Sequence, residues 1–438
     1  MPVLDLKYLR RKNAEGMEFV VSSMPKSPTV TVLVLFKVGS RQERNEQSGI
    51  SHFLEHMVFK GNKLFGKPKE VAEAIESLGG SFNAFTSKEY TGFYAKVGAE
   101  FAEKALKWLA ALVSSPLIKQ KDVDSERGVI FEEINMYNDT PARQVGDDFE
   151  DLLLGGTTLG RSIIGTQKTL KKMSSSDLKG YYSDFYNPKN TVFVVAGNLE
   201  KILKKEDLKK NFSSKLEKFF QDLPKNRKGE LQEEAPKSNN SNKKIKVIYK
   251  KTDQTHLVIG SKTFSLFDER RYPLLLLNTI LGGGMSSWAF SEIREKRGLA
   301  YYVNSGMHLY KDTGYLAVNA GVSNSKLKLA IQEIVKLFSK MEKGLFTKEE
   351  IKKAKDQVIG SMLLQRETSD DIAFLLGSEI ASKDDFTQFS KEIELIKKIE
   401  KKDLEKVAKE FFVKENLHLA LIGPWKKKDE EEFEGLMK

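Results

Sequence analysis

Ser-His-Phe-Leu-Glu-His, at residues 51–56, is the most informative stretch of this sequence of 438 residues. On a helix, His52 and His56 lie one turn apart on the same face, so both imidazoles can reach a single ion. Glu55 shares that face, where a carboxylate can take a proton from an attacking water and deliver it to a leaving amine. The pattern predicts a hydrolytic metal centre. The alternative is that two of the five histidines only cap or pack a helix.

A third ligand must come from elsewhere, because a catalytic metal site of this kind uses three protein ligands and one open position. The other histidines lie in the second half of the chain and cysteine is absent, so a carboxylate is expected. Residues 125–137 have a helical pattern in which Glu126 and Glu133 lie two turns apart on one face, while Glu132 is rotated by about 100°. This spacing favours Glu133 as the ligand and Glu126 as a residue that orients a histidine. Solvated acidic residues are the common alternative on such a helix.

Composition limits the remaining classes of protein. The 72 Lys and Arg outnumber the 61 Asp and Glu, and the formal charge of +11 would suit nucleic acid or an anionic membrane. The basic runs, however, lie in polar stretches with few aromatic residues to stack bases, so we expect no nucleic-acid partner. Without cysteine the chain has no disulfide framework and no thiolate ligand. Imidazole and carboxylate ligands then favour zinc, with manganese and cobalt as alternatives.

Neither a membrane anchor nor a secretory signal is apparent. No uncharged apolar stretch approaches the roughly 20 residues that a membrane helix needs. The basic residues within 1–12 are not followed by the apolar core of a signal peptide. We therefore expect a cytoplasmic protein with no membrane partner.

The chain divides into two halves with elements in the same order. A polar stretch at residues 224–244 predicts a linker between domains 1–223 and 245–438. Each half is predicted to contain a strand, a helix, a second strand, an amphipathic helix and a closing strand before a glycine. These elements are residues 29–38, the helix that holds His52, 94–97, 100–113 and 191–195, and then 256–260, 272–281, 315–320, 326–341 and 417–422. An internal duplication explains this order, and coincidence between two similar domains is the alternative.

This alternation of helices and strands favours the α+β class. We expect two homologous domains, each a mostly antiparallel sheet with helices packed on one face. Only the first half contains His-x-x-Glu-His, so one metal ion per chain is expected.

Residues 49–61 carry a family resemblance. They read Gly-Ile-Ser-His-Phe-Leu-Glu-His-Met-Val-Phe-Lys-Gly, similar to the signature of the family that includes pitrilysin, insulin-degrading enzyme and mitochondrial processing peptidase. In that family the third zinc ligand is a glutamate in a Glu-Arg-x-x-Ile helix, which residues 126–133 resemble. The resemblance implies a zinc endopeptidase in which Glu133 is a ligand and Glu55 is catalytic.

Residues 79–87 are similar to the strand at which this family binds its substrates. The resemblance implies that an extended peptide adds to this edge as a further strand. The implied substrate-binding residues are Asn83, which would hold a substrate carbonyl, Ala84, Phe85 and Thr86. Read without the resemblance, the stretch is an ordinary strand after a Gly-Gly turn.

Two segments of the second half, residues 281–287 and 294–301, resemble the glycine loop and the Arg–Tyr pair of the family. By this resemblance Arg294 grips the substrate backbone and Tyr301 donates a hydrogen bond to the oxyanion. Their ordinary interpretations are a surface helix charge and a strand aromatic. Residues 157–160 depart from the family by reading Thr-Thr-Leu-Gly where relatives often have His-Pro-Leu-Gly, so the resemblance implies no contacts for that loop.

The resemblance also implies an assembly. Single-chain relatives of twice this length enclose a chamber with four such domains. This chain is therefore expected to form a clamshell homodimer in which Arg294 and Tyr301 of one subunit complete the zinc site of the other. Such a chamber would admit unfolded peptides. The alternative is a non-catalytic or partner-dependent structural subunit of the family, although intact His52, Glu55, His56 and Glu133 argue against it.

Overall fold

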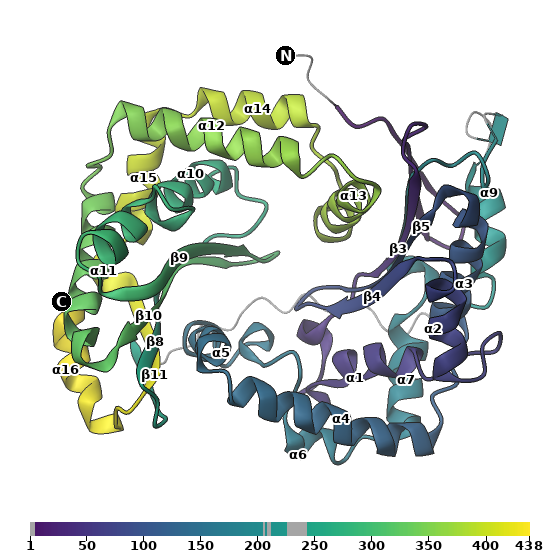
Figure 1. Ribbon diagram of the computed structural model, residues 1–438, viewed down its shortest axis with the longest axis horizontal. Coiled ribbons are helices and arrows are strands. Elements are labelled where there is room, and N and C mark those ends of the chain that lie inside the picture. The colour runs from purple at the N-terminus through teal and green to yellow at the C-terminus, as the bar shows by residue number, and fades with distance from the viewer. Residues whose placement is uncertain (1–4, 205, 208–211, 226–242) are drawn as a thin grey trace. The chain divides into compact units, whose positions relative to one another are not determined.

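The computed structural model describes residues 5–204, 206–207, 212–225 and 243–438 (Figure 1). Most of the predicted linker at 224–244 lies outside these residues. The chain forms two compact units. The first consists of Met1–Asn135, Arg161–Glu233 and Leu363–Gln388, and the second of Met136–Gly160, Glu234–Met362 and Phe389–Lys438. The predicted ranges 1–223 and 245–438 contain one sheet each, whereas each compact unit also includes a segment from the other range.

The first unit is built on a six-stranded sheet in the order β1-β2-β6-β3-β5-β4. Strands β2 and β6 are parallel and every other pair is antiparallel. The strands are β1 (Tyr8–Lys12), β2 (Glu18–Ser23), β3 (Thr29–Phe36), β4 (Ser81–Thr86), β5 (Thr91–Gly98) and β6 (Thr191–Gly197). The helices assigned to this unit are α1 (Ile50–Val58), α2 (Pro68–Glu76), α3 (Ala102–Ser114), α4 (Gln120–Asn138), α6 (Gln167–Leu170), α7 (Ser175–Phe185), α9 (Phe212–Glu217) and α13 (Ser369–Lys383).

Helices cover both faces of this sheet. On one face α3 packs against β3 and β5. On the other face α13 packs against β3 and β6, and Figure 1 shows α13 beside β3. Alternate residues of β3 point to opposite faces, and Leu33 and Leu35 share a buried cluster with Leu376 of α13. Strand β3 is therefore apolar almost throughout, as expected for a strand buried on both sides.

The second unit has a five-stranded sheet in the order β7-β11-β8-β10-β9, in which only β7 and β11 are parallel. Its strands are β7 (Ile245–Tyr249), β8 (Gln254–Thr263), β9 (Ala300–Leu309), β10 (Gly314–Ser323) and β11 (Leu417–Gly423). Its helices are α5 (Pro141–Leu154), α10 (Arg271–Gly282), α11 (Leu327–Glu342), α12 (Lys348–Leu364), α14 (Phe389–Lys398), α15 (Lys401–Phe411) and α16 (Glu430–Met437), with a π-helical segment at Phe290–Glu295.

The predicted α+β class and the two similar, mostly antiparallel sheets are confirmed. Without β1, the first sheet matches the second strand for strand, including the single parallel pair next to one edge. The helix on the second face of each sheet was not predicted. In the second unit this helix is α5, whose Val145 and Phe149 pack against Val258, Ala420 and other residues of the sheet.

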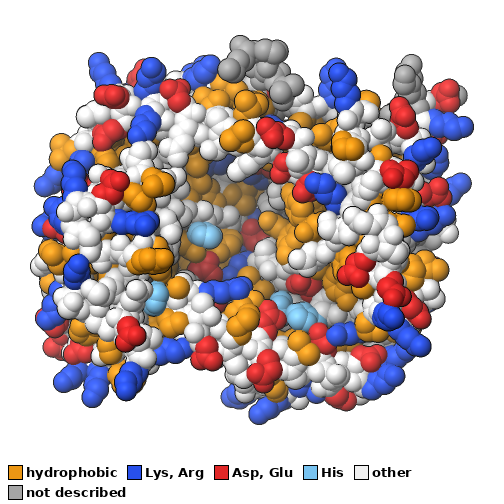
Figure 2. All heavy atoms as spheres, in the orientation of Figure 1, with side chains coloured by type: hydrophobic (Ala, Val, Ile, Leu, Met, Phe, Trp, Pro, Cys, Tyr) orange, Lys and Arg blue, Asp and Glu red, His pale blue; other side chains and the backbone are white. Residues whose placement is uncertain are grey.

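Charged side chains of both signs are mixed on the face of the molecule that Figure 2 shows. In Figure 2 lysine and arginine side chains alternate with acidic ones across the visible face and do not gather in one patch. The described helices include none with the length and apolar character of a membrane span.

Candidate metal centre

Helix α1 presents the predicted motif on its less buried face. Its apolar side chains, including Phe53, Leu54 and Met57, are fully buried within the first unit. His52, Glu55 and His56 lie on the other side and are half-buried. Helix α1 is therefore amphipathic: its apolar face packs in the core, and its other face carries the three residues of the motif.

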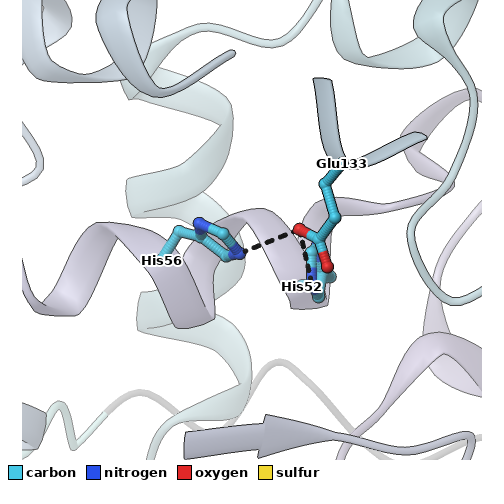
Figure 3. A group of neighbouring side chains, drawn as sticks. All are labelled: His52, His56 and Glu133. Carbon is cyan, nitrogen blue, oxygen red and sulfur yellow. Dashed lines mark ion pairs between the residues drawn. The ribbon is translucent and has the colours of Figure 1, made fainter. Parts of the chain in front are cut away.

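Helix α4 brings Glu133 to the two histidines. Its Oε2 atom lies 3.7 Å from Nε2 of His52 and 3.5 Å from Nε2 of His56. Figure 3 shows the two imidazoles and the carboxylate directed toward one another. One ligand atom from each residue lies within 4.8 Å of the others, and no second group of three such residues occurs in the part of the chain that the structure describes. Two imidazole nitrogens and one carboxylate oxygen fit a catalytic zinc site.

The charge around His56 also suits a cation. Burial lowers the pKa of His56, but hydrogen bonds to Glu126 and Glu133 and the charges of these carboxylates raise it to about 9. In the absence of a metal the imidazole therefore holds a proton. A divalent ion would take the place of that positive charge among the carboxylates.

Glu126 lies behind His56, as the predicted orienting role requires. Its Oε1 is 2.9 Å from Nδ1 of His56, and its Oε2 forms an ion pair with Lys60. Burial raises the pKa of Glu126, but the hydrogen bonds from His56 and Lys60 outweigh it and lower the pKa. An ionised Glu126 accepts a hydrogen bond from the Nδ1–H group of His56, which leaves Nε2 directed at the metal position. Lys60 was not predicted, although it follows His56 by four residues.

Glu55 contacts the predicted substrate strand through Thr86. Oγ1 of Thr86, the last residue of β4, lies 2.6 Å from Oε2 of Glu55. Burial raises the pKa of Glu55, the hydrogen bond from Thr86 and the charge of His56 lower it, and the charge of Glu133 raises it again, so that the pKa lies above its ordinary value. Nothing in the sequence indicated this bond, because residues 55 and 86 belong to different elements.

The other residues of the predicted substrate strand line the edge of the sheet. Strand β4 is the last strand in the order, so it is an edge strand. Asn83 is exposed and its Oδ1 accepts a hydrogen bond from the backbone N–H of Ala84. Phe85 is half-buried against Tyr90 and Phe374 of α13. The substrate-binding roles of these residues remain predictions.

Glu43 holds the beginning of α1, a role that was not predicted from the sequence. Gly49 caps the helix at φ 96°, and a Cβ there would meet the carbonyl oxygen of Ile164 at 2.7 Å, so glycine is required and no side chain caps the helix. The buried Glu43 instead accepts hydrogen bonds from the backbone N–H groups of Gly49, at 2.8 Å, and Ser51, at 2.9 Å. Burial raises the pKa of Glu43 to about 7 against these bonds.

Arg294 and Tyr301 belong to the second unit. Arg294 lies in the π-helical segment, and its guanidinium carbon is 4.8 Å from the centroid of the Phe290 ring. Tyr301 lies near the start of β9 with 75% of its surface exposed. Segments of π-helix often occur at functional sites. The predicted roles of both residues in substrate binding and in stabilising an oxyanion remain predictions.

Comparison with known proteins places the chain in a peptidase family. Residues 18–167 match the family model described as insulinase, peptidase family M16, and residues 172–358 match that of the peptidase M16 inactive domain. A relative from Bacillus subtilis, named an uncharacterized zinc protease, is 36% identical over 81% of this chain and 83% of its own length. One from Rickettsia felis with a similar name is 32% identical over 94% of this chain and 97% of its own length.

The crystal structure of a protease from Helicobacter pylori is 25% identical, with a TM-score of 0.84 over 96% of this chain and all of the other. A crystal structure from Pseudomonas fluorescens, titled a peptidase M16 inactive domain, has a TM-score of 0.86 at 20% identity over 96% of this chain and 99% of its own, which supports the fold alone. The two sheets of similar strand order, the His-x-x-Glu-His motif on α1 and these relatives agree, and the chain belongs to peptidase family M16, the insulinase family.

Proposed function

We propose that this chain is a zinc-dependent endopeptidase that hydrolyses internal bonds of unfolded peptides. The observation that carries the proposal is the convergence of His52, His56 and Glu133, from two helices, beside Glu55. A bound zinc ion supplies positive charge that polarises a carbonyl and makes a water more acidic. Glu55 would take the proton from the attacking water and deliver it to the leaving amine.

The edge strand β4 supports a peptide substrate in extended form. A peptide that adds to β4 gains backbone hydrogen bonds that do not depend on its sequence, and folded proteins cannot offer a free strand so readily. Since β4 ends at Thr86, which contacts Glu55, a bound peptide would run past the catalytic carboxylate. This geometry favours unfolded segments as substrates.

The test of the proposal is peptide hydrolysis by the zinc-loaded protein. We expect a quenched fluorescent peptide to be cleaved internally, activity to disappear on chelation, and zinc to restore it. Replacement of Glu55 by Gln should retain zinc and lower kcat by roughly 10²–10⁴-fold, because a positioned general base is removed. A zinc-loaded protein that cleaves none of a broad peptide library would contradict the proposal.

The proposal includes a composite active site in a homodimer. It rests on the presence of a zinc-type site and of the Arg294–Tyr301 pair in one chain. Two inactive variants, Glu55→Gln and Tyr301→Phe, should recover activity when mixed, because one of the mixed sites would have both intact parts. If subunits exchange and no activity returns, the site is not shared.

A non-catalytic subunit is the second candidate, since one matching family model describes an inactive domain. That model covers residues 172–358, whereas all four residues of the candidate site lie within 18–167, the range of the insulinase model. Absence of zinc and of hydrolysis would favour this second candidate.

A further inference from the structure

The bond between Thr86 and Glu55 joins the edge strand to the helix of the candidate site. We propose that Thr86 is a positioning residue that holds one oxygen of Glu55 in place, so that peptide binding and proton transfer share one strand. This inference rests on the proposed peptidase function and goes beyond it, because the resemblance assigned Thr86 only to substrate binding.

Thr86 itself is held rigidly. It ends β4 opposite Thr91 of β5, and the connecting turn is closed by a hydrogen bond from the backbone N–H of Ser87 to the carbonyl of Tyr90, at 2.8 Å. Within the turn, Glu89 forms a buried ion pair with Arg41, whose Nη1 lies 2.6 Å from its Oε1. A buried, charge-assisted pair of this kind holds the turn in place, and with it the backbone at Thr86.

The turn is also attached to the chain that leads into α1. The backbone N–H of Ser40 donates to the carbonyl of Ser87 at 3.1 Å, and that of Arg41 donates to the carbonyl of Lys88 at 2.8 Å. Two residues after Arg41, the side chain of Glu43 accepts hydrogen bonds from the two backbone N–H groups at the start of α1. One segment, residues 40–43, therefore fixes both the strand end that carries Thr86 and the helix that carries Glu55.

The two oxygens of Glu55 are in different situations. Oε2 accepts the short hydrogen bond from Thr86, whereas no donor among the described residues hydrogen-bonds to Oε1. The terminal torsion of a free glutamate is broad, so an unanchored carboxylate would sample many orientations. With Oε2 held, Oε1 is the oxygen left to exchange a proton with water and the leaving amine.

A threonine hydroxyl suits both protonation states of Glu55. It donates to the carboxylate before proton transfer, and after transfer it can still donate to the carbonyl oxygen or turn and accept. A backbone N–H group could only donate. The same contact can therefore hold the side chain before and after it receives the proton.

Two substitutions of Thr86 separate the hydrogen bond from packing. Thr86→Val keeps the shape of the side chain and removes the hydroxyl, whereas Thr86→Ser keeps the hydroxyl and removes the methyl group. We expect Val to lower kcat by roughly 10–100-fold, the cost of a displaced catalytic group, with KM and zinc affinity nearly unchanged. Ser should retain kcat within about threefold, because the hydrogen bond survives.

The matched control is Thr91→Val, one strand further into the same sheet. Thr91 is fully buried, and its Oγ1 donates to the carbonyl of Val38 at 2.9 Å, not to Glu55. The folded fraction of Thr91→Val should keep the kcat of the unaltered protein. This result would exclude the explanation that loss of any hydroxyl from this sheet lowers kcat.

Equal kcat for Thr86→Val and the unaltered protein, or equal losses for Val and Ser, would overturn the positioning role. Both outcomes leave the peptidase proposal intact as long as Glu55→Gln is inactive and the unaltered protein loses activity on chelation. If the unaltered, zinc-loaded protein shows no hydrolysis, the peptidase proposal fails, and the inference about Thr86 fails with it.

Discussion

The two sheets have the same strand order, but only the first carries the candidate metal site. In the first unit the helix after the second of the matched strands is α1, with His52, Glu55 and His56 on one face. In the second unit the corresponding helix is α10, whose sequence Arg-Tyr-Pro-Leu-Leu-Leu-Leu-Asn-Thr-Ile-Leu-Gly has no ligand and is largely buried. The two units therefore share a fold, and only the side chains on the corresponding helix determine which unit has a candidate metal site.

The largest effect is expected from removing the third ligand. Glu133→Gln should abolish stoichiometric zinc binding and lower peptide hydrolysis by roughly 10³-fold or more, because the neutral amide is a poor replacement for the carboxylate. Glu132→Gln, the exposed neighbour, is the control and should leave zinc content and activity unchanged. Zinc analysis after dialysis and a peptide assay make the comparison, and equal behaviour of the two variants would refute the assignment.

A smaller effect is expected from Lys60, which pairs with Glu126 behind His56. Lys60→Met should weaken zinc affinity by roughly 10–100-fold, as for other residues that support a metal ligand from behind. Lys63→Met is a suitable control, since Lys63 is exposed and pairs with the exposed Asp222 at 3.5 Å. Competition with a chromophoric chelator measures both. An unchanged affinity in Lys60→Met would show that Glu126 needs no cationic partner.

The close packing of α13 on the second face of the first sheet can be tested by a substitution at Gly377. A Cβ at this position would meet Cδ1 of Leu35 at 2.7 Å and Cδ2 of Leu33 at 2.9 Å. Gly377→Leu should therefore destabilise the protein by about 1–3 kcal/mol through overpacking. At Gly360, in α12, an added Cβ meets nothing within 4 Å, so Gly360→Ala should be neutral or stabilising by up to about 1 kcal/mol. Urea denaturation compares the two, and equal stability would mean that α13 is loosely packed.

The smallest expected effect is a change in stability at acidic pH, which is absent at neutral pH. It concerns the corresponding strands β6 and β11, the last strand of each half. Burial lowers the pKa of His418 in β11 to about 4, below the value of 6.5 for an exposed histidine. Between these values the unfolded chain binds the proton more readily, so His418 contributes stability that is present above pH 6.5 and is lost as the pH falls toward 4. His418→Val would match the second residue of β6, Val192.

The unfolding free energy of the variant should fall less steeply with decreasing pH over that range. The difference in slope should correspond to the uptake of up to one proton fewer on unfolding. Unfolding free energies measured from pH 4 to 7 provide the test. An identical slope in both proteins would show that His418 is accessible to protons in the folded state.

Much of the fold could be predicted because its elements have strong periodicity. Residues 29–38 and 417–422 alternate or run apolar as strands do, and the structure has β3 and β11 there. The helices on the second face of each sheet could not be predicted. Helix α13 has apolar residues around most of its surface, which shows that it is buried but not which sheet it covers.

The candidate site likewise has residues that the sequence predicted and residues that it did not. His52, Glu55 and His56 lie within one helix, so their spacing alone placed them on one face. Spacing favoured Glu133 only over its neighbours, and the resemblance was needed to connect it with the two histidines, because spacing within its own helix cannot show which distant element it meets. Thr86 and Glu43 were not recognised as partners of α1, since their contacts depend on how a turn and a strand end pack against it.

Whether His52, His56 and Glu133 bind one zinc ion can be seen in a zinc-edge anomalous difference map from crystals of the zinc-loaded protein. We expect one peak per chain, about 2.0–2.2 Å from Nε2 of His52, Nε2 of His56 and a carboxylate oxygen of Glu133. A strong peak elsewhere in the chain, or a fully zinc-loaded protein with Glu133 turned away from the two imidazoles, would contradict it.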